Sequence, residues 1–176
     1  MKKPVLYTIG HSTRTLIEFM ELLHAYDVRQ IVDVRTIPNS RHNPQFNGEE
    51  LKVSLRQSGI CYKHRPKLGG LRHSKKGSKN LGWHNVSFRG FADYMSTPAF
   101  GEGVDELLRI AVKKVTAIMC AEAVPWRCHR ALVADALIKR GWVVRDIMSR
   151  TSAPRRRLTP FLKVRSGVIT YPAPSA

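Results

Sequence analysis

Short apolar segments alternate with amphipathic segments along most of this chain, and this alternation constrains the fold more than any other feature. Segments typical of buried strands lie at 4–9, 30–34, 59–63, 115–119 and 142–147. Helical periodicity predicts one helix that begins near 13–15 and others at 49–57, 88–95, 100–112 and 128–139. Strands and helices that alternate in this way form a mainly parallel sheet with helices on both faces. The sequence therefore predicts an α/β fold, a single compact domain of the Rossmann-like, three-layer type.

Local capping signals support these helices. Thr15 and Glu18 have the spacing of a capping box. Asn47 and Glu50 have the same spacing before the next predicted helix. Gly141 stands after the last predicted helix, where glycine commonly ends one. We therefore expect helices that begin close to Thr15 and Asn47.

The predicted α/β domain covers 1–150, and 151–176 form a basic C-terminal extension that we expect to be partly ordered. Within the extension, 161–164 and 168–171 are predicted to add an edge hairpin or to pack as a tail. The segment 64–87 is rich in glycine and has no strand or helix pattern. Long loops in compact domains tend to be functional or disordered.

The formal net charge of the chain is +17. Most of this excess lies in two segments that contain basic residues and no acidic residue. Between Glu50 and Asp93 lies the central basic segment, with Lys52, Arg56, Lys63, Arg65, Lys67, Arg72, Lys75, Lys76, Lys79 and Arg89. After Asp146 lies the C-terminal basic segment, with Arg150, Arg155, Arg156, Arg157, Lys163 and Arg165. Charge concentrated in this way attracts polyanions. The alternative is a solvated surface that only maintains solubility.

Composition excludes several classes of protein. Hydrophobic residues make up 43% of the chain, which is typical of a globular protein rather than a disordered one. No apolar run approaches the roughly 18 residues needed to cross a bilayer, and the first residues lack the pattern of a secretion signal. Three cysteines are too few for a disulfide framework. We therefore predict a cytoplasmic protein with reduced thiols and no membrane partner.

Chemically distinctive residues follow three of the predicted strands. His11 and Ser12 follow the first strand, 35–41 follow the second, and 120–122 follow the fourth. Ligands of open parallel sheets bind beyond the carboxyl ends of the strands. These residues, distant in sequence, are therefore expected to share one edge of the sheet.

The most distinctive segment is 120–130, in which a predicted strand ends and a helix begins. Cys120 or Cys128 would serve as a thiolate nucleophile, with His129 or Glu122 as its proton-transfer partner. The start of a helix offers N–H groups and a dipole that bind anions and lower the pKa of a thiol. Arg130 would add a contact to a phosphate or carboxylate.

Other interpretations of this segment stay open. Cys120, at the end of an apolar strand, fits equally a small buried residue. Cys128 and His129 would then only pack or cap a helix. The C-x7-C-H spacing is not a standard zinc pattern, so no metal site is predicted. A redox pair of Cys120 and Cys128 requires a bridging distance that sequence does not give.

A second candidate anion site lies after the second predicted strand. Arg35, Ser40 and Arg41 fall within seven residues of one another. Asp33 would act as an acid or as an orienting group for them. The alternative is that Arg35 makes only a structural ion pair.

Two further segments are weaker candidates for binding a substrate. His11 and Ser12 lack the fuller glycine pattern of a dinucleotide or Walker loop. Gly69 and Gly70 provide a flexible backbone beside Arg72, within the central basic segment. Together with nearby aromatic residues, this segment would grip a nucleic acid through charge and stacking, unless those aromatics belong to the core.

Several motifs occur together in an order that resembles a known family. They are Tyr7–Ser12, Val32–Arg35 with Pro38 and Ser40-Arg41, Leu68–Arg72, Ser87-Phe88, Gly90–Met95, Met119–Glu122 and Cys128–Arg130. Together they closely resemble the bacterial and archaeal family named domain of unknown function 488, over about residues 5–150. The resemblance implies a compact α/β domain and marks these positions as the family's signature. It implies no reaction, substrate or cofactor.

These observations predict an enzyme that acts on a phosphate-bearing substrate, a nucleotide or a nucleic acid, without a cofactor. Arg35, Arg41 and Arg130 would hold the anion beside the two thiols. The alternative is a non-catalytic module that binds nucleic acid through the two basic segments. Such binding would survive loss of the thiols and would weaken when Arg155, Arg156 and Arg157 are replaced. The oligomeric state is not predicted.

Overall fold

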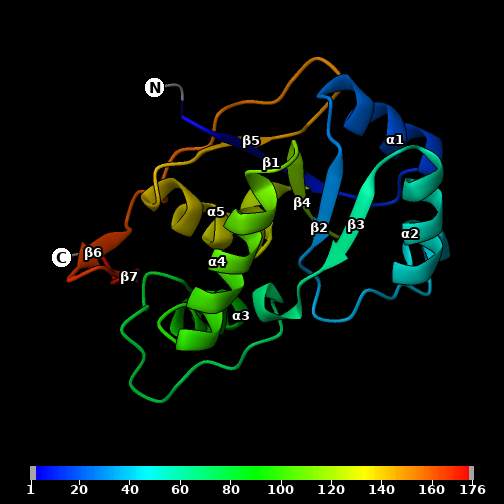
Figure 1. The fold of residues 1–176 in the computed structure, drawn as a ribbon. Coiled ribbons are helices and arrows are strands. Elements are labelled where there is room, and N and C mark those ends of the chain that lie inside the picture. The colour runs from blue at the N-terminus through cyan, green and yellow to red at the C-terminus, as the bar shows by residue number, and fades with distance from the viewer. Residues whose placement is uncertain (1–2, 175–176) are drawn as a thin grey trace.

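A parallel β-sheet forms the centre of the molecule in a computed structural model that describes residues 3–174. Its strands are β1 (Val5–Gly10), β2 (Gln30–Asp33), β3 (Cys61–His64), β4 (Thr116–Cys120) and β5 (Val143–Asp146). Within the described residues the sheet has five strands in the order β3-β2-β4-β1-β5, all parallel (Figure 1). The predicted α/β fold is confirmed.

The register of the strands brings their carboxyl ends to one edge. Gly10 at the end of β1 is paired with Cys120 at the end of β4. Asp33 at the end of β2 is paired with Met119 and with His64. The order of the strands is not their order in sequence, because β4 inserts between β1 and β2. That insertion places the residues after β4 between those after β1 and β2.

Helices cover both faces of the sheet (Figure 1). The helices α1 (Leu16–Ala25) and α2 (Gly48–Gln57) pack on one face, and α4 (Pro98–Ala111) and α5 (Arg130–Lys139) pack on the other. Successive residues of a strand point to opposite faces, so Ile31 joins the core under α1 and α2, whereas Val32 joins the core under α4 and α5. The three-layer arrangement follows from this alternation.

The helix boundaries differ slightly from those predicted. Thr15 and Glu18 form the expected capping box at the start of α1. Asn47 precedes α2 but its side chain does not cap the helix; it accepts a hydrogen bond from the backbone N–H of Ser40 instead. The last long helix begins at Arg130 rather than at 128, after a short 3-10 turn over Pro125–Arg127. Arg140 and Gly141, which has a φ of 88°, end that helix as expected.

The C-terminal segment packs against α5. Thr159 and Tyr171 both donate hydroxyl hydrogen bonds to the buried carboxylate of Asp135, at 2.7 and 2.9 Å. Strands β6 (Lys163–Arg165) and β7 (Val168–Thr170) form an antiparallel hairpin, as the sequence suggested. The hairpin is a separate two-stranded sheet and not an added edge of the central one.

The remaining elements connect the layers. A short 3-10 turn, η2 (Pro66–Leu68), leads into the long predicted loop, which ends at α3 (Val86–Tyr94). Another, η1 (Pro44–Phe46), precedes α2. Among residues 3–174, no helix combines the length and the apolar character needed to cross a bilayer.

Candidate functional site

A cavity of about 480 Å³ opens at the carboxyl edge of the sheet, and we call it the rim pocket. Its walls come from the ends of β1, β2 and β4, from the start of α5, and from the first turn of α3. Residues from these five places include His11, Arg35, Cys120, His129 and Ser87. The expectation that distant segments share one edge of the sheet is therefore met by the strand order.

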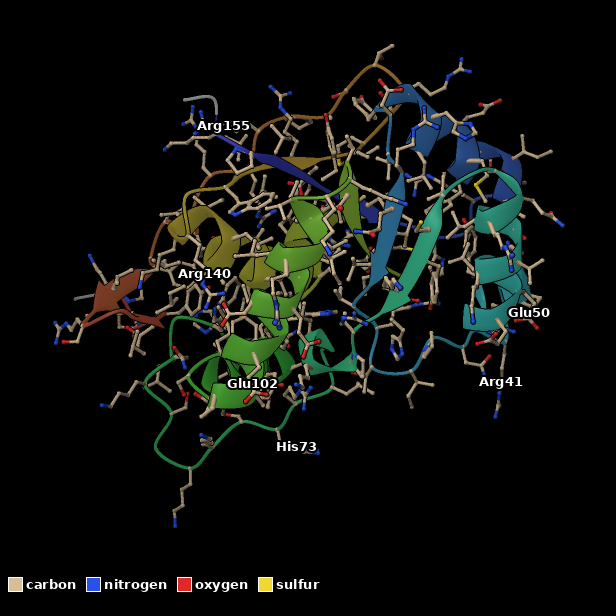
Figure 2. The ribbon with its side chains drawn as sticks, viewed as in Figure 1. Arg41, Glu50, His73, Glu102, Arg140 and Arg155 are labelled. Carbon is tan, nitrogen blue, oxygen red and sulfur yellow. The ribbon has the colours of Figure 1, made fainter. Side chains whose placement is uncertain are left out.

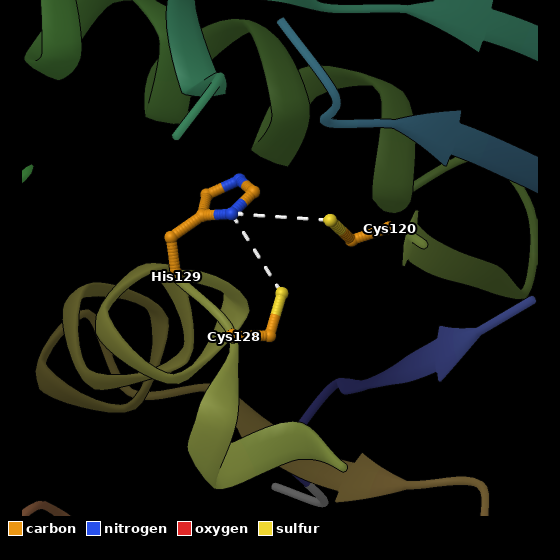
Figure 3. A group of neighbouring side chains, drawn as sticks. All are labelled: Cys120, Cys128 and His129. Atoms are coloured by element: carbon orange, nitrogen blue, oxygen red, sulfur yellow. Dashed lines mark hydrogen bonds between the residues drawn. The ribbon is translucent and has the colours of Figure 1, made fainter. Parts of the chain in front are cut away.

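Two thiols and an imidazole form a cluster at the base of the rim pocket (Figure 3). The Nδ1 atom of His129 lies 3.9 Å from Sγ of Cys120 and 3.7 Å from Sγ of Cys128. The three atoms all lie within 4.8 Å of one another. Cys120 is half-buried, whereas Cys128 is buried. The thiol of Cys120 is thus the more accessible of the two.

The orientation of His129 is fixed on several sides. Its Nε2–H donates to the carbonyl of Val34 at 3.0 Å, which leaves Nδ1 to accept a proton from a thiol. The ring of Phe91 packs edge-on against the imidazole, with centroids 5.1 Å apart. A Cβ atom at Gly70 would lie 2.6 Å from Nδ1. Only glycine at position 70 leaves the imidazole where it is.

Arg130 places a buried positive charge close to the thiols. Its side chain is 1% exposed. Nη2 donates to the carbonyl of Glu122 at 2.8 Å, while Nε and Nη1 have no hydrogen-bond partner among the described residues. A buried charge without a counter-charge is costly. A thiolate on the neighbouring cysteines would supply the missing negative charge.

The two thiols share their protons unequally. A hydrogen bond from the Cys128 thiol, together with His129 and the charge of Arg130, lowers the pKa of Cys120 well below its ordinary value, although burial opposes this. The same hydrogen bond to Cys120, together with burial, raises the pKa of Cys128. The arrangement therefore favours a thiolate at Cys120 and a neutral thiol at Cys128.

Residues 15–137, more than half of the chain, match the family described as Domain of unknown function DUF488. The chain belongs to the DUF488 family. The match runs from the start of α1 into α5, so it includes the Cys120–Cys128–His129 cluster and Arg130 but not His11. Searches of curated proteins and of solved structures give no significant match.

Within this DUF488 domain, Arg35 is held mainly by its own neighbours. Its guanidinium donates to the carboxylate of Asp33 at 2.6 Å and to the carbonyl of Phe46 at 2.7 Å. The structural ion pair that the sequence left open is therefore present. Tyr62 donates its hydroxyl to the same carboxylate at 2.7 Å. Arg35 still lines the rim pocket, but most of its hydrogen-bonding capacity is used.

His11 connects Arg35 to the first strand. Its Nδ1–H donates to the carbonyl of Ser12 at 2.8 Å, and its Nε2 accepts from Nη1 of Arg35 at 3.3 Å. The ring stacks on Phe46 with centroids 4.3 Å apart. Burial, together with the positive charge of Arg35, lowers the pKa of His11. His11 is therefore a neutral imidazole that orients the guanidinium.

Other predicted residues lie around the rim pocket in varied positions. Ser40, Gly70 and Glu122 line it. The carboxylate of Glu122 is exposed and accepts from the N–H of Val124 at 3.1 Å. Ser12 contributes through its backbone, with a φ of 50° and an N–H that donates to Ala121.

Three predicted residues lie away from the thiols. Arg72 lies over the ring of Tyr94 at 3.7 Å and donates to the carbonyl of Gly69. Gly69 is packed against Thr36, so a Cβ atom there would clash. Arg41 is exposed and points outward beside α2 (Figure 2). It is not among the described residues that line the rim pocket.

Sequence reasoning did not name Asn85 and Arg127 of the pocket wall, and it named Ser87 and Phe88 without assigning them to this site. Asn85, Ser87 and Phe88 enter it from α3. Arg127 enters it from the 3-10 turn before α5 and is exposed. The basic turn residue after Pro125 and the Ser87-Phe88 motif were the available signals, but the α3 residues meet the site only through tertiary packing.

The cluster also has the composition of a three-ligand metal site. Two thiolates and an imidazole are ligands that Zn²⁺ prefers, and a fourth position would open into the rim pocket. A metal-bound histidine typically donates its other N–H to a carbonyl, as His129 does to Val34. The buried charge of Arg130 opposes a divalent cation at this position. The spacing rule used on the sequence did not foresee the cluster, because β4 and α5 bring the ligands together.

Proposed function

We propose that this DUF488 protein is a cysteine-dependent enzyme that transfers or hydrolyses a group of a small phosphate-bearing substrate, with Cys120 as the nucleophile. The observation that carries the proposal is the position of the Cys120 thiol. It faces the rim pocket, 3.9 Å from an imidazole nitrogen whose partner nitrogen is bound to a backbone carbonyl. A nucleophile next to a base that is held by a third group is the usual arrangement for covalent catalysis.

His129 acts as the base and then as the acid. Nδ1 takes the proton of Cys120, and the thiolate attacks the electrophilic centre of the substrate. A bond from sulfur to that centre forms as the bond to the leaving oxygen breaks, and the leaving oxygen takes the proton from Nδ1. Water or a second acceptor then releases the covalent intermediate. The carbonyl of Val34 stabilises the imidazolium throughout.

Cys128 and Arg130 stabilise the thiolate without reacting. The buried thiol of Cys128 lies next to Cys120 and, by donating a hydrogen bond, lowers the pKa of Cys120. Arg130 supplies a positive charge that no carboxylate neutralises, since its three nitrogens meet one carbonyl and no other described acceptor. Arg127 lies at the mouth of the pocket, where an exposed guanidinium suits a phosphate group.

The rate of alkylation by iodoacetamide as a function of pH tests the nucleophile. We expect Cys120 to be modified with an apparent pKa below the ordinary thiol value of about 8.5. Mass spectrometry of the digested protein identifies which cysteine reacts, and Cys120→Ser should abolish the fast phase. Incubation with a panel of nucleoside mono-, di- and triphosphates should leave a covalent adduct or a product that requires Cys120.

Arg130→Met sharpens the test, because it removes the buried charge and keeps an apolar chain of similar length. We expect the apparent pKa of Cys120 to rise by about one unit, or about 1.4 kcal/mol. Arg127→Met is the matched control: it removes the same charge from an exposed position, where solvent screens it. An ordinary pKa at Cys120, or equal shifts in the two variants, contradicts the proposal.

Metal analysis of the purified protein separates the proposal from a metal centre. A nucleophile leaves the thiols free to alkylate and gives no stoichiometric zinc. A zinc site instead protects Cys120 and Cys128 together, and protection is lost on chelation. That second result would overturn the assignment of Cys120 as a nucleophile.

A further inference from the structure

A second cavity lies where the two basic segments of the chain meet. It has a volume of about 620 Å³ and lies between the long loop before α3 and the hairpin of β6 and β7 (Figure 1). Five basic side chains line it: Lys75, Lys76, Lys79, Lys163 and Arg165. The first three belong to the central basic segment, and the other two belong to the C-terminal one. We call this cavity the basic cleft.

We infer that the basic cleft binds the phosphate backbone of a single-stranded nucleic acid. This inference goes beyond the proposed chemistry and does not depend on Cys120. A concave surface lined by cations from two walls can follow a flexible polyanion, which is the electrostatic part of sequence-independent binding to single strands.

One wall of the cleft is built around a buried carboxylate. Asp93 accepts hydrogen bonds from the hydroxyl of Ser78 at 2.6 Å, from the N–H of Lys75 at 2.8 Å and from the amide of Asn80 at 2.8 Å. Burial opposes its ionisation, but these hydrogen bonds outweigh burial and lower the pKa of Asp93. The loop is therefore wrapped around a fixed charge that is turned inward, and the lysines are left on the outside.

The second wall is joined to the first. The side-chain oxygen of Asn80 accepts from the N–H of Tyr171 at 2.9 Å, and the N–H of Gly82 donates to the carbonyl of Tyr171 at 2.9 Å. Lys139 of α5 donates to the carbonyl of Gly167 in the hairpin turn. The cleft thus has two connected walls and is more than an accidental gap between a loop and a tail.

Within residues 3–174 the five cations form no ion pairs, because the one carboxylate in the wall of the cleft, Asp93, is used by hydrogen bonds from its own loop. Other basic residues of this chain do find carboxylates: Lys67 pairs with Glu102 and Glu106, and Arg140 pairs with Asp105. Unpaired like charges around one cavity repel one another, and an anionic ligand removes that repulsion.

The shape of the cleft favours a nucleic acid over a membrane. The cations line a hollow, and a flat anionic surface would reach only those at its margin. None of the described residues that line the cleft is aromatic, so bases have no stacking platform there and the backbone is what is held. Lysines, which make up four of the five, bind phosphates as point charges.

Fluorescence anisotropy with a labelled oligothymidylate of about 12 nucleotides tests the inference on the full chain. Each phosphate contact with a single strand contributes about −0.7 to the slope of log K against log salt, so five cations predict a slope of up to about −3.5. Lys163→Gln with Arg165→Gln should reduce the slope by about 1.4 and weaken binding about tenfold at about 50 mM salt. The triple replacement of Lys75, Lys76 and Lys79 by Gln should act more strongly.

The matched control is Arg155→Gln with Arg157→Gln. Both residues are exposed, and their replacement removes the same charge as replacement of the hairpin pair. Arg155 lies beside β5, well away from the hairpin (Figure 2). The control should bind like the wild type, because neither residue lines the basic cleft; the sequence alone predicts weaker binding on replacement of Arg155, Arg156 and Arg157. Equal weakening in the two pairs shows binding by net charge alone, and this result overturns the cleft as the site.

Competitors and a thiol variant complete the test. A duplex of the same length, polyglutamate and anionic lipid vesicles should each displace the labelled strand less well than unlabelled single strand; stronger displacement by any of them overturns the inference. Cys120→Ser should bind the oligonucleotide like the wild type. The experiments therefore distinguish a wrong assignment of Cys120 as the nucleophile from a wrong assignment of the basic cleft as the nucleic-acid site.

Discussion

The rim pocket and the basic cleft use charge in opposite ways. At the rim pocket Asp33, Arg35 and His11 are buried and bound to one another, while Glu122 and Arg127 in its wall are exposed. In the basic cleft the cations stand on a loop and a hairpin and have no described carboxylate partner. Buried groups that are fully hydrogen-bonded hold a fixed geometry, which chemistry requires. Exposed, unpaired cations suit capture of a flexible anion.

The two cavities are also close to each other along one helix. Ser87 of α3 lines the rim pocket and Asp93 of the same helix lines the basic cleft. Six residues of α-helix span about 9 Å. Substitutions can disturb either cavity while the other is left intact.

The largest expected effect breaks the cleft and leaves the rim pocket intact. Asp135→Ala removes the acceptor for Thr159 and Tyr171 and leaves buried donors unsatisfied, which should lower the free energy of unfolding by about 3 kcal/mol. Urea denaturation measures this loss. Oligonucleotide binding should weaken because the hairpin wall is released, whereas the alkylation rate of Cys120 should stay within about twofold. Asp135→Asn, which keeps one acceptor, should lose less; equal losses in both variants would contradict the role of these hydrogen bonds.

A smaller effect breaks the rim pocket and leaves the cleft intact. Gly70→Ala places a Cβ atom against the imidazole of His129, which must then move away from the thiols. The alkylation rate of Cys120 near neutral pH should fall about tenfold, the equivalent of about 1.4 kcal/mol, with oligonucleotide binding unchanged. Gly101→Ala is the control, since nothing lies within 4 Å of a Cβ atom there. If the two alanine variants react alike, the contact with His129 does not set the reactivity.

The smallest expected effect is on the pH dependence of the free energy of unfolding, and it tests the burial of His11 at the rim pocket. The pKa of His11 is lowered in the folded protein, so the unfolded chain takes up a proton first as the pH falls below about 6.5. Stability from the neutral imidazole is therefore present above that pH and is lost as the pH falls towards the folded pKa. His11→Gln should make the free energy of unfolding less dependent on pH as the pH falls below about 6.5. Replacement of the exposed His73 (Figure 2) controls for the loss of one imidazole; an unchanged pH dependence in His11→Gln would contradict this sign.

Much of the fold could be predicted because its signals are local. The period of apolar residues distinguishes strands from helices, and the capping box at Thr15 and Glu18 fixes the start of α1. Asn47 shows the limit of such reasoning: the same spacing occurs, but its side chain binds Ser40 across a loop. A local sequence pattern predicts a hydrogen bond to a nearby residue, but a tertiary contact can use the same side chain for a different hydrogen bond.

The candidate site was predicted in part for the same reason. Cys120, Cys128 and His129 were found because a strand end and a helix start are recognisable in sequence. Asn85, directly before α3, lies in the same cavity, but nothing in its sequence neighbourhood indicated this. Arg41 follows the same strand as Arg35, but its exposed side chain points outward beside α2 (Figure 2), so its role as an anion contact stays a prediction.

The sequence by itself determined the α/β alternation, the two basic segments and the residues after each strand. Only the tertiary structure decided which of those residues meet. The insertion of β4 between β1 and β2 sets the end of β4 beside His11 and Val34, and the contact of Tyr171 with Asn80 joins the two basic segments into one cleft. The reason is physical: hydrophobic periodicity depends on near neighbours in the chain, whereas strand order and long-range hydrogen bonds depend on how the whole core packs.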